Sequence, residues 1–355
     1  MPLSHILASD ALAHLAQFDT VIDARSESEF VQDHLPGAVN WPSLNDEQRH
    51  RVGTEYKQVS AFAAKKRGAA LVARNIAAHI EQHVMERDKR WRPLVYCWRG
   101  GKRSGSLALV LDQIGFRVQV LEGGYREYRK AVITALETLP ETLKLRVVCG
   151  TTGSGKSRLL GVLAELGEQV LDLETLANHR GSVLGLTPGE QQPGQKCFET
   201  RLCDALRKFD VARPVWVESE SKKVGDLHVP AALITHMRTS PCMNLQLSLE
   251  GRVRLLLEDY GHFVADIAAF CGRLDALRVW RGTDVVDRWQ STAHSAGVES
   301  VVRELLLLHY DPIYLQSIRR NFGQFATPLA QVGWDGSAAT LRQAALAMLA
   351  ASESA

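Results

Sequence analysis

A cysteine followed by a glycine pair and three cations is the stretch of this 355-residue sequence best suited to covalent chemistry. Cys97 ends a short apolar run, and a helical pattern begins at Ser104. Backbone N–H groups of such a strand–loop–helix, with the positive end of the helix dipole, form a cradle for an anion. We predict that this field and the cations Arg99, Lys102 and Arg103 lower the pKa of the Cys97 thiol and make it a nucleophile.

A second stretch, residues 150–157, has the pattern G-x4-G-K-S of a phosphate-binding loop. It lies between an apolar strand pattern at 145–149 and an apolar helix pattern at 159–166. Its backbone would cradle a diphosphate, Lys156 would neutralise the charge, and Ser157 would hold Mg²⁺ if a metal takes part. The residues of this predicted diphosphate site are Gly150, Thr152, Gly153, Ser154, Gly155, Lys156 and Ser157.

Two acidic residues end predicted strands that should lie near this loop. Asp172 follows the apolar pair 170–171, and Glu218 ends the apolar run that begins at 215. Either carboxylate could organise a metal or a water, although neither matches a Walker B aspartate. We find no motif that would read a nucleotide base, so the diphosphate need not belong to a nucleotide.

A polar stretch rich in Gly, Pro and Gln lies between those two strands. It begins with Asn-His-Arg-Gly-Ser at 178–182 and runs to Lys196. His179, Arg180 and Lys196 are candidate lid or phosphate contacts, because mobile polar loops often close over bound ligands. A surface loop without a function is the other interpretation of this composition.

Positive charge is concentrated in one region, although the formal net charge is only +2. Between Arg49 and Arg103 there are 14 Lys and Arg residues against 4 Asp and Glu. Clustered cations with interleaved aromatic residues suit contact with nucleic-acid phosphates and bases, while solvated helix faces are the alternative. Arg67 and Trp98 are candidate contacts within this region. The aromatic residues in or beside it are Trp41, Tyr56, Trp91 and Trp98.

The surrounding pattern predicts two α/β domains. In residues 1–140 short strands alternate with helices, which argues for a parallel sheet covered on both faces. Residues 141–355 hold the phosphate loop and its strands, followed by a helical region from about residue 251. Within that region we predict a helix end and a restart at 305–312, and we expect this tail only to pack.

Composition limits the class and location of the protein. Its 45% apolar and 23% charged residues are typical of a soluble globular protein. We find no apolar run long enough to span a membrane and no signal-peptide pattern, so we expect a cytoplasmic location. The six cysteines form no CxxC pair, which favours reduced thiols over disulfides or a zinc site, and we predict no metal-ligand set.

The N-terminal domain resembles a rhodanese domain. Four landmarks occur in the expected order: Asp23-x-Arg25, residues 34–40, the Cys97 loop, and Leu121-Glu122-Gly123-Gly124. Cys97 and Arg103 enclose five residues, whereas single-domain rhodaneses usually have four. This spacing is similar to that of the rhodanese-like phosphatases, which implies a ring of N–H groups wide enough for a tetrahedral oxyanion.

Nearly the whole chain resembles the tRNA 2-selenouridine synthase family, a fusion of a rhodanese domain with a P-loop domain. The resemblance implies a transferase acting on wobble 2-thiouridine in tRNAs for Lys, Glu and Gln. Geranyl diphosphate would first S-geranylate the base, and selenium from selenophosphate would then replace the geranylthio group. We expect no tightly bound cofactor, no membrane partner, and a transient contact with selenophosphate synthase. The matching segments are 97–101, 150–157, 178–182, 217–221 and 309–312.

The resemblance assigns separate roles to the two loops. The phosphate loop would stabilise the departing diphosphate. Cys97 would either accept selenium as a perselenide or attack C2 of the base, with Arg99, Lys102 and Arg103 holding phosphate. The basic region would carry the tRNA.

Two other functions remain open. One is a sulfurtransferase or Cys-x5-Arg phosphatase fused to an ATP-using P-loop kinase, which tight ATP binding would favour. The other is a non-catalytic tRNA-binding module, which the presence of Cys97, Lys156 and Ser157 disfavours.

Overall fold

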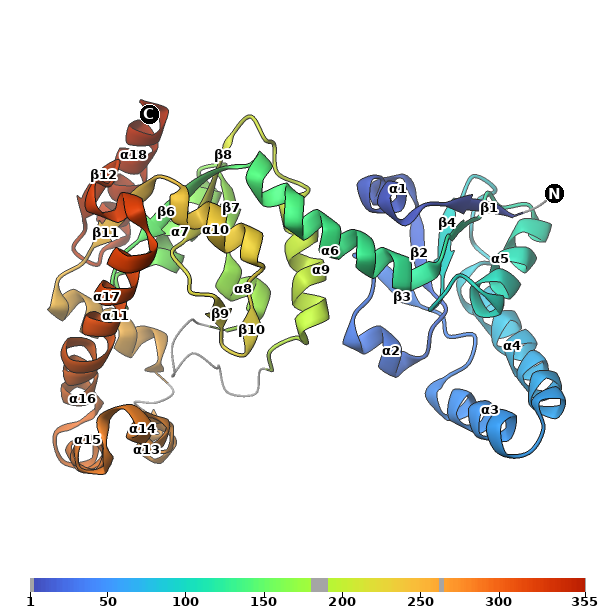
Figure 1. The fold of residues 1–355 in the computed structure, drawn as a ribbon, viewed down its shortest axis with the longest axis horizontal. Helices are drawn as coiled ribbons and strands as arrows, with labels where there is room; N and C mark the ends of the chain where they lie inside the picture. The colour runs from blue at the N-terminus through green and yellow to red at the C-terminus, as the bar shows by residue number, and fades with distance from the viewer. Residues whose placement is uncertain (1–2, 180–190, 262–264, 355) are drawn as a thin grey trace. The chain divides into compact units, whose positions relative to one another are not determined.

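The computed structural model describes residues 3–179, 191–261 and 265–354, which form two compact units (Figure 1). One unit contains Met1–Glu137 and Pro193–Arg207, and the other contains Thr138–Gln192 and Lys208–Ala355. The chain therefore passes from one unit to the other three times.

The first unit is built on a parallel five-stranded sheet in the order β1-β5-β4-β2-β3, as the alternation of strands and helices predicts. The strand β4, which leads to Cys97, is buried along its whole length. The strands are β1 Ser4–Ile6, β2 Thr20–Asp23, β3 Ala38–Asn40, β4 Pro93–Tyr96 and β5 Gln119–Leu121.

Helices surround this sheet. The long helix α4 is preceded by α3, which is polar and buries no residue. A capping box formed by Asn45 and Gln48 fixes its start instead. The helices of this unit are α1 Ala8–Ala13, α2 Glu27–Gln32, α3 Asp46–Gln58, α4 Ala61–His83, α5 Lys102–Ile114, α9 Gln195–Leu206 and the larger part of α6 Gly124–Thr142, with a 3-10 turn at Leu15–Gln17.

Two aromatic residues expected beside the nucleic acid lie in the core of this unit. Trp41 is 4% exposed and Trp91 is 5% exposed. Trp41 stacks on the rings of His79 and His83, and Trp91 packs edge-on against Phe116. The prediction that Trp41 and Trp91 stack on bases is therefore wrong, because these side chains complete the core.

The second unit is built on another parallel sheet, in the order β12-β11-β6-β8-β7. The central strand β6 leads to the phosphate loop, and its neighbour β8 ends at Glu218. The edge strand β12 was not predicted. The strands are β6 Lys144–Cys149, β7 Gln169–Leu171, β8 Pro214–Glu218, β11 Cys242–Gln246 and β12 Ala330–Gly333, with a hairpin of β9 Lys223–Val224 and β10 Leu227–His228.

A separate helical core in this unit includes Phe270, Leu274, Trp289, Val301 and Leu305. In the described ranges no helix is long and apolar enough to cross a membrane. The helices are α7 Lys156–Glu165, α8 Leu173–Ala177, α10 Ala231–Thr239, α11 Leu249–Asp259, α13 Ile267–Leu274, α14 Arg278–Arg281, α15 Thr283–Ala296, α16 Val298–Leu305, α17 Asp311–Asn321 and α18 Ala338–Glu353, with 3-10 turns at Asp275–Leu277 and Gly323–Ala326.

The predicted helix end at 305–312 is wrong. A π-helical turn, Leu306–Tyr310, joins α16 to α17 without an interruption. Pro312 lies in the first turn of α17, where a residue without an N–H is tolerated. The π-helical turn before Pro312 keeps the helix continuous, and π-helical turns are frequent at functional sites.

Candidate functional site

Cys97 follows β4 directly and lies in the loop that leads into α5. Its side chain is buried, and its Sγ accepts a hydrogen bond from Ser104 Oγ at 3.1 Å. Gly101 is the residue that precedes the first turn of α5, so the thiol lies at the positive end of this helix.

The environment of Cys97 favours the thiolate. Burial alone would raise the pKa of the thiol, but hydrogen bonds from the Ser104 side chain and from the backbone N–H groups of Ser104, Arg99 and Gly101 outweigh it. The pKa of Cys97 therefore lies below its usual value, in the predicted direction. These hydrogen bonds are the leading causes that lower the pKa, whereas we expected the field of the loop and helix, together with the cations, to lower it.

The three cations of the loop differ in what they contact. Arg99 and Lys102 are exposed. Arg103 is partly buried and donates from Nη1 to Glu29 Oε2 at 2.9 Å, and Arg49 contacts the same carboxylate oxygen at 3.3 Å. In this arrangement Arg99 and Lys102 present their charge to solvent beside the Cys97 loop, while the charge of Arg103 is balanced by a carboxylate.

Titration of Cys97 should report the role of Ser104. We expect the absorbance difference at 240 nm between the wild type and Cys97→Ala to rise at a pH below that of an ordinary thiol. Ser104→Ala should move this midpoint upward, because the thiolate loses a donor while its burial stays. Ser106→Ala is the control, since Ser106 bonds to the Lys102 carbonyl instead. An unchanged midpoint in Ser104→Ala would contradict the assigned cause.

The Asp23-x-Arg25 landmark forms a buried ion pair that supports the loops around Cys97. Arg25 Nη2 lies 2.6 Å from Asp23 Oδ2 and also donates to the Asp33 carbonyl. Tyr96, the residue before Cys97, donates to the same Asp23 oxygen at 2.8 Å. The Arg25 guanidinium lies 3.9 Å from the centre of the Tyr125 ring. Removal of either partner of this buried, hydrogen-bonded ion pair would leave the other charge unpaired in the core, which is strongly destabilising.

The glycine pair after β5 lets a second loop approach the Cys97 loop. The backbone of Tyr125 donates to the Cys97 carbonyl at 2.8 Å. Gly124 has φ +62°, and a Cβ added there would lie 2.3 Å from the Cys97 carbonyl oxygen and 2.5 Å from Gly100 N. This contact and this backbone conformation both require glycine.

Gly124→Ala should therefore destabilise this unit and disturb the thiol. We expect the free energy of unfolding in urea to fall by about 2–4 kcal/mol, because strain in φ adds to a backbone clash. Gly105→Ala is the matched control, because Gly105 lies in α5 with nothing near the position of its Cβ. Equal free energies of unfolding for the two variants would show that the Gly123-Gly124 loop can move away from the Cys97 loop without loss of stability.

The phosphate loop has the strand–loop–helix geometry that its sequence predicts. Gly153 and Gly155 have positive φ values of 76° and 90°. α7 begins at Lys156, whose Nζ donates to the Gly150 carbonyl at 2.8 Å. Burial alone would lower the pKa of Lys156, but the charges of Tyr314 and three carboxylates raise it by more, so the net shift is upward. Lys156 is therefore a charged amine at the start of a helix.

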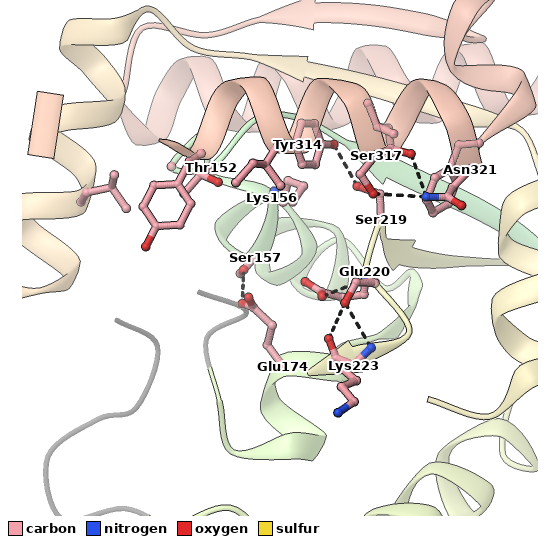
Figure 2. A pocket seen from close by; sticks show the side chains of 18 of the residues that line it. Thr152, Lys156, Ser157, Glu174, Ser219, Glu220, Lys223, Tyr314, Ser317 and Asn321 are labelled. Atoms are coloured by element: carbon pink, nitrogen blue, oxygen red, sulfur yellow. Dashed lines mark hydrogen bonds between the residues drawn. The ribbon is translucent and has the colours of Figure 1, made fainter. Parts of the chain in front are cut away.

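Three glutamates gather beside Ser157. Ser157 Oγ donates to Glu174 Oε2 at 2.8 Å (Figure 2). It also lies 3.5 Å from Glu218 Oε2. Glu174, Glu218 and Glu220 each offer a carboxylate oxygen within 4.8 Å of the others. Burial and the neighbouring carboxylates raise the pKa of Glu218 well above its usual value. These oxygens fit a hard divalent cation such as Mg²⁺, which would relieve the repulsion.

Of the two acids predicted for this role, the structure places one beside Ser157. Glu218 ends β8 and lies in the glutamate cluster. Asp172 instead caps α8, because its two carboxylate oxygens accept from Thr175 N and Thr175 Oγ1 at 2.8 Å. Sequence reasoning missed Glu174 and Glu220. Glu220 lies in the matching segment 217–221, but Glu174 had no signal that separates it from an ordinary helix acid.

Residues from the C-terminal region hold the phosphate loop in place. Trp334 Nε1 donates to the Ser154 carbonyl, and Arg252 Nη1 donates to the Thr152 carbonyl. Tyr314 OH accepts from Gly150 N at 2.8 Å. The expectation that this tail only packs is therefore wrong, because α11, α17 and Trp334, the residue after β12, bring side chains to the loop.

A pocket of about 1160 Å³ opens over the phosphate loop. Thr152, Lys156 and Ser157 line it from the loop side, with Glu174 and Glu220 beside them (Figure 2). The rest of the lining from α11, the π-helical turn, α17 and the residues that directly follow the two helices is mixed. Its apolar and aromatic members are Leu255, Leu256, Tyr260, Tyr310, Ile313, Tyr314, Ile318 and Phe322, and its polar members are Asp259, His309, Ser317, Arg320 and Asn321.

The other predicted contact residues are scattered. Arg67 pairs with Glu55 at 2.8 Å, and the Trp98 ring packs 5.5 Å from that of Tyr125. His179 is half-buried at the end of α8. Lys196 lies on α9, in the unit that contains Cys97. Arg180 lies outside the described residues.

Comparisons with known proteins agree with this division into two sites. Residues 7–131 match the model of the rhodanese-like domain, and residues 143–283 match that of the tRNA 2-selenouridine synthase AAA domain. Proteins described as tRNA 2-selenouridine synthase are similar over most of the chain. The one from Nitrosomonas europaea is 39% identical over 71% of this chain and 66% of its own length. The one from Alcanivorax borkumensis is 37% identical over 77% of this chain and 76% of its own length. A third, from Marinobacter nauticus, is 36% identical over 86% of this chain and 89% of its own.

The fold and the two sites thus define a protein in which a rhodanese-like domain with a buried cysteine is joined to a P-loop α/β domain with a helical tail. The predicted fold class is therefore confirmed. The chain belongs to the tRNA 2-selenouridine synthase family.

Proposed function

We propose that this protein modifies wobble 2-thiouridine in tRNAs for Lys, Glu and Gln, in two transfer steps. The P-loop unit would transfer a geranyl group from geranyl diphosphate to sulfur, and the Cys97 unit would then replace the geranylthio group by selenium from selenophosphate. The names of the relatives support a tRNA substrate and a selenouridine product.

The observation that carries the first step is the composition of the P-loop pocket. The diphosphate-binding loop with Lys156 shares its pocket with apolar and aromatic side chains of α11 and α17, such as Leu256, Ile313 and Tyr314, so the pocket suits a diphosphate attached to a hydrocarbon chain. No base-reading motif was found in the sequence, which also favours an isoprenoid over a nucleotide.

The chemistry of this step can be written with these residues. The thiocarbonyl sulfur attacks the first carbon of the geranyl chain, the carbon–oxygen bond breaks, and the diphosphate leaves with the electron pair. N3 of the base loses its proton. Lys156 and the loop N–H groups stabilise the charge that develops on the diphosphate. Ser157, Glu174 and Glu218 would hold Mg²⁺, which supplies further charge neutralisation when bound.

The second step is assigned to Cys97. Its lowered pKa increases the fraction of the nucleophilic thiolate relative to an ordinary cysteine. Arg99 and Lys102, which are exposed beside the loop, would hold the phosphate of selenophosphate.

The test is a reconstitution followed by nucleoside mass spectrometry. The full chain is incubated with 2-thiouridine tRNA and geranyl diphosphate, with and without selenophosphate. We expect the geranylated nucleoside without selenophosphate and 2-selenouridine with it. If ATP binds tightly and geranyl diphosphate neither binds nor reacts, the chain is a P-loop kinase fusion instead.

A further inference from the structure

We propose that the rim of the P-loop pocket is a second anion-binding subsite, which takes backbone phosphates of the RNA acceptor. Four cations, Lys222, Lys223, Arg238 and Arg320, line the same pocket as the phosphate loop. The inference rests on the proposed alkyl transfer to tRNA, because it identifies where the acceptor strand enters the pocket.

The four rim cations come from three elements that are distant in the sequence. Lys222 and Lys223 lie at the start of the β9–β10 hairpin. Arg238 lies in the last turn of α10, and Arg320 lies in the last turn of α17. Their convergence on one pocket is a property of the fold that no linear charge run predicts.

These cations differ in pairing from those nearer the loop. Lys156 Nζ donates to the Gly150 carbonyl at 2.8 Å, and Arg158 contacts Asp259 at 2.7 Å. Within residues 3–179, 191–261 and 265–354, none of the four rim side chains forms an ion pair or a hydrogen bond. The rim therefore keeps its positive charge at the pocket opening, and such a charge attracts anions into the opening.

The position of this charge favours a polymeric anion. Lys222, Lys223 and Arg320 are exposed, so a phosphate can approach from solvent while its base enters the pocket. Ser317 and Asn321 lie on the same helix as Arg320 and line the same pocket (Figure 2). A hydroxyl and an amide beside cations are groups that bind ribose, phosphate and base edges in RNA.

The test compares neighbouring arginines on α17 in the full chain. Arg320 lines the pocket, whereas the adjacent Arg319 is exposed and is not part of its lining. We would measure binding of an anticodon stem–loop RNA containing 2-thiouridine over a range of salt concentrations, and separately the binding of geranyl diphosphate. The KM for this RNA in geranyl transfer is the third readout.

Arg320→Ala should weaken RNA binding about five-fold, raise the KM for RNA by a similar factor, and reduce the salt dependence by about one phosphate contact. The double variant Lys222→Ala/Lys223→Ala should weaken RNA binding, raise the KM for RNA and reduce the salt dependence by larger amounts. Arg319→Ala should resemble the wild type, and geranyl diphosphate should bind all variants alike.

The inference is overturned if Arg320→Ala and the double lysine variant match Arg319→Ala in RNA binding, or if they lose geranyl diphosphate instead. Failure of the proposed function gives a different result: the wild type then neither binds nor transfers the geranyl group, whatever its affinity for RNA.

Discussion

Lys156→Ala should lose geranyl transfer by at least about 100-fold in a single-turnover assay. The amine is the charged group at the start of α7. It lies 2.8 Å from the Gly150 carbonyl and 5.5 Å from the centre of the Tyr314 ring. Without it, the departing diphosphate faces three glutamates and loses its nearest positive charge. The measurement is the appearance of the geranylated nucleoside by mass spectrometry.

The control for Lys156→Ala is Lys144→Ala. Lys144 begins β6 in the same unit, and its Nζ donates to the Ala212 carbonyl at the surface. This variant should transfer geranyl at the wild-type rate. Both variants should be checked for an unchanged thermal unfolding midpoint. Full activity in folded Lys156→Ala would exclude the phosphate loop as the diphosphate site.

Cys97→Ser should abolish selenium incorporation while geranyl transfer continues. The hydroxyl is close in size to the thiol and can keep the contact with Ser104, but it does not ionise near neutral pH. The geranylated nucleoside should therefore accumulate in the presence of selenophosphate. Normal selenium incorporation by Cys97→Ser would remove Cys97 from the mechanism.

Electron balance separates the two roles considered for Cys97. Selenophosphate carries selenium at the selenide level, so a perselenide on Cys97 forms, with cleavage of the Se–P bond and release of phosphate, only when a two-electron oxidant is supplied. After its outer selenium attacks C2 and displaces the geranylthiolate, cleavage of the remaining S–Se bond needs two electrons from an added thiol. Direct attack of the thiolate on C2 displaces the geranylthiolate. The selenium of selenophosphate then displaces the cysteine thiolate, and water cleaves the Se–P bond to release phosphate, so this route needs neither an oxidant nor a reductant. Turnover of wild type without an added oxidant or thiol would favour direct attack, whereas strict dependence on both would favour the perselenide.

The parts of the site that the sequence predicts are contiguous in the chain. In the Cys97 loop and the phosphate loop, a strand, a turn and a helix start occur within about a dozen residues, so local sequence determines where the N–H groups point. The parallel sheets were predictable for a similar reason, because central strands such as β4 and β6 are short, largely apolar and followed by a helix, whereas the edge strand β12 gave no such signal.

The parts that sequence reasoning missed depend on contacts between distant segments. Trp334 and Tyr314 reach the phosphate loop from 180 and 164 residues away along the chain. Glu174 becomes part of the glutamate cluster only because β7 lies beside β8. Trp41 and Trp91 look like stacking residues in a basic region, and only their packing shows that they belong to the core.

Helix α9 makes the boundary between the two units discontinuous in sequence. It belongs to the compact unit of Cys97, where Arg129 pairs with Glu199 and Thr200 Oγ1 donates to Asp33 at 3.0 Å. A fragment cut after residue 137 would retain Asp33 and Arg129 but lose both of these partners. The gene therefore cannot be divided into two independent halves by a single cut, and any attempt to separate the two chemistries must carry α9 along with the cysteine.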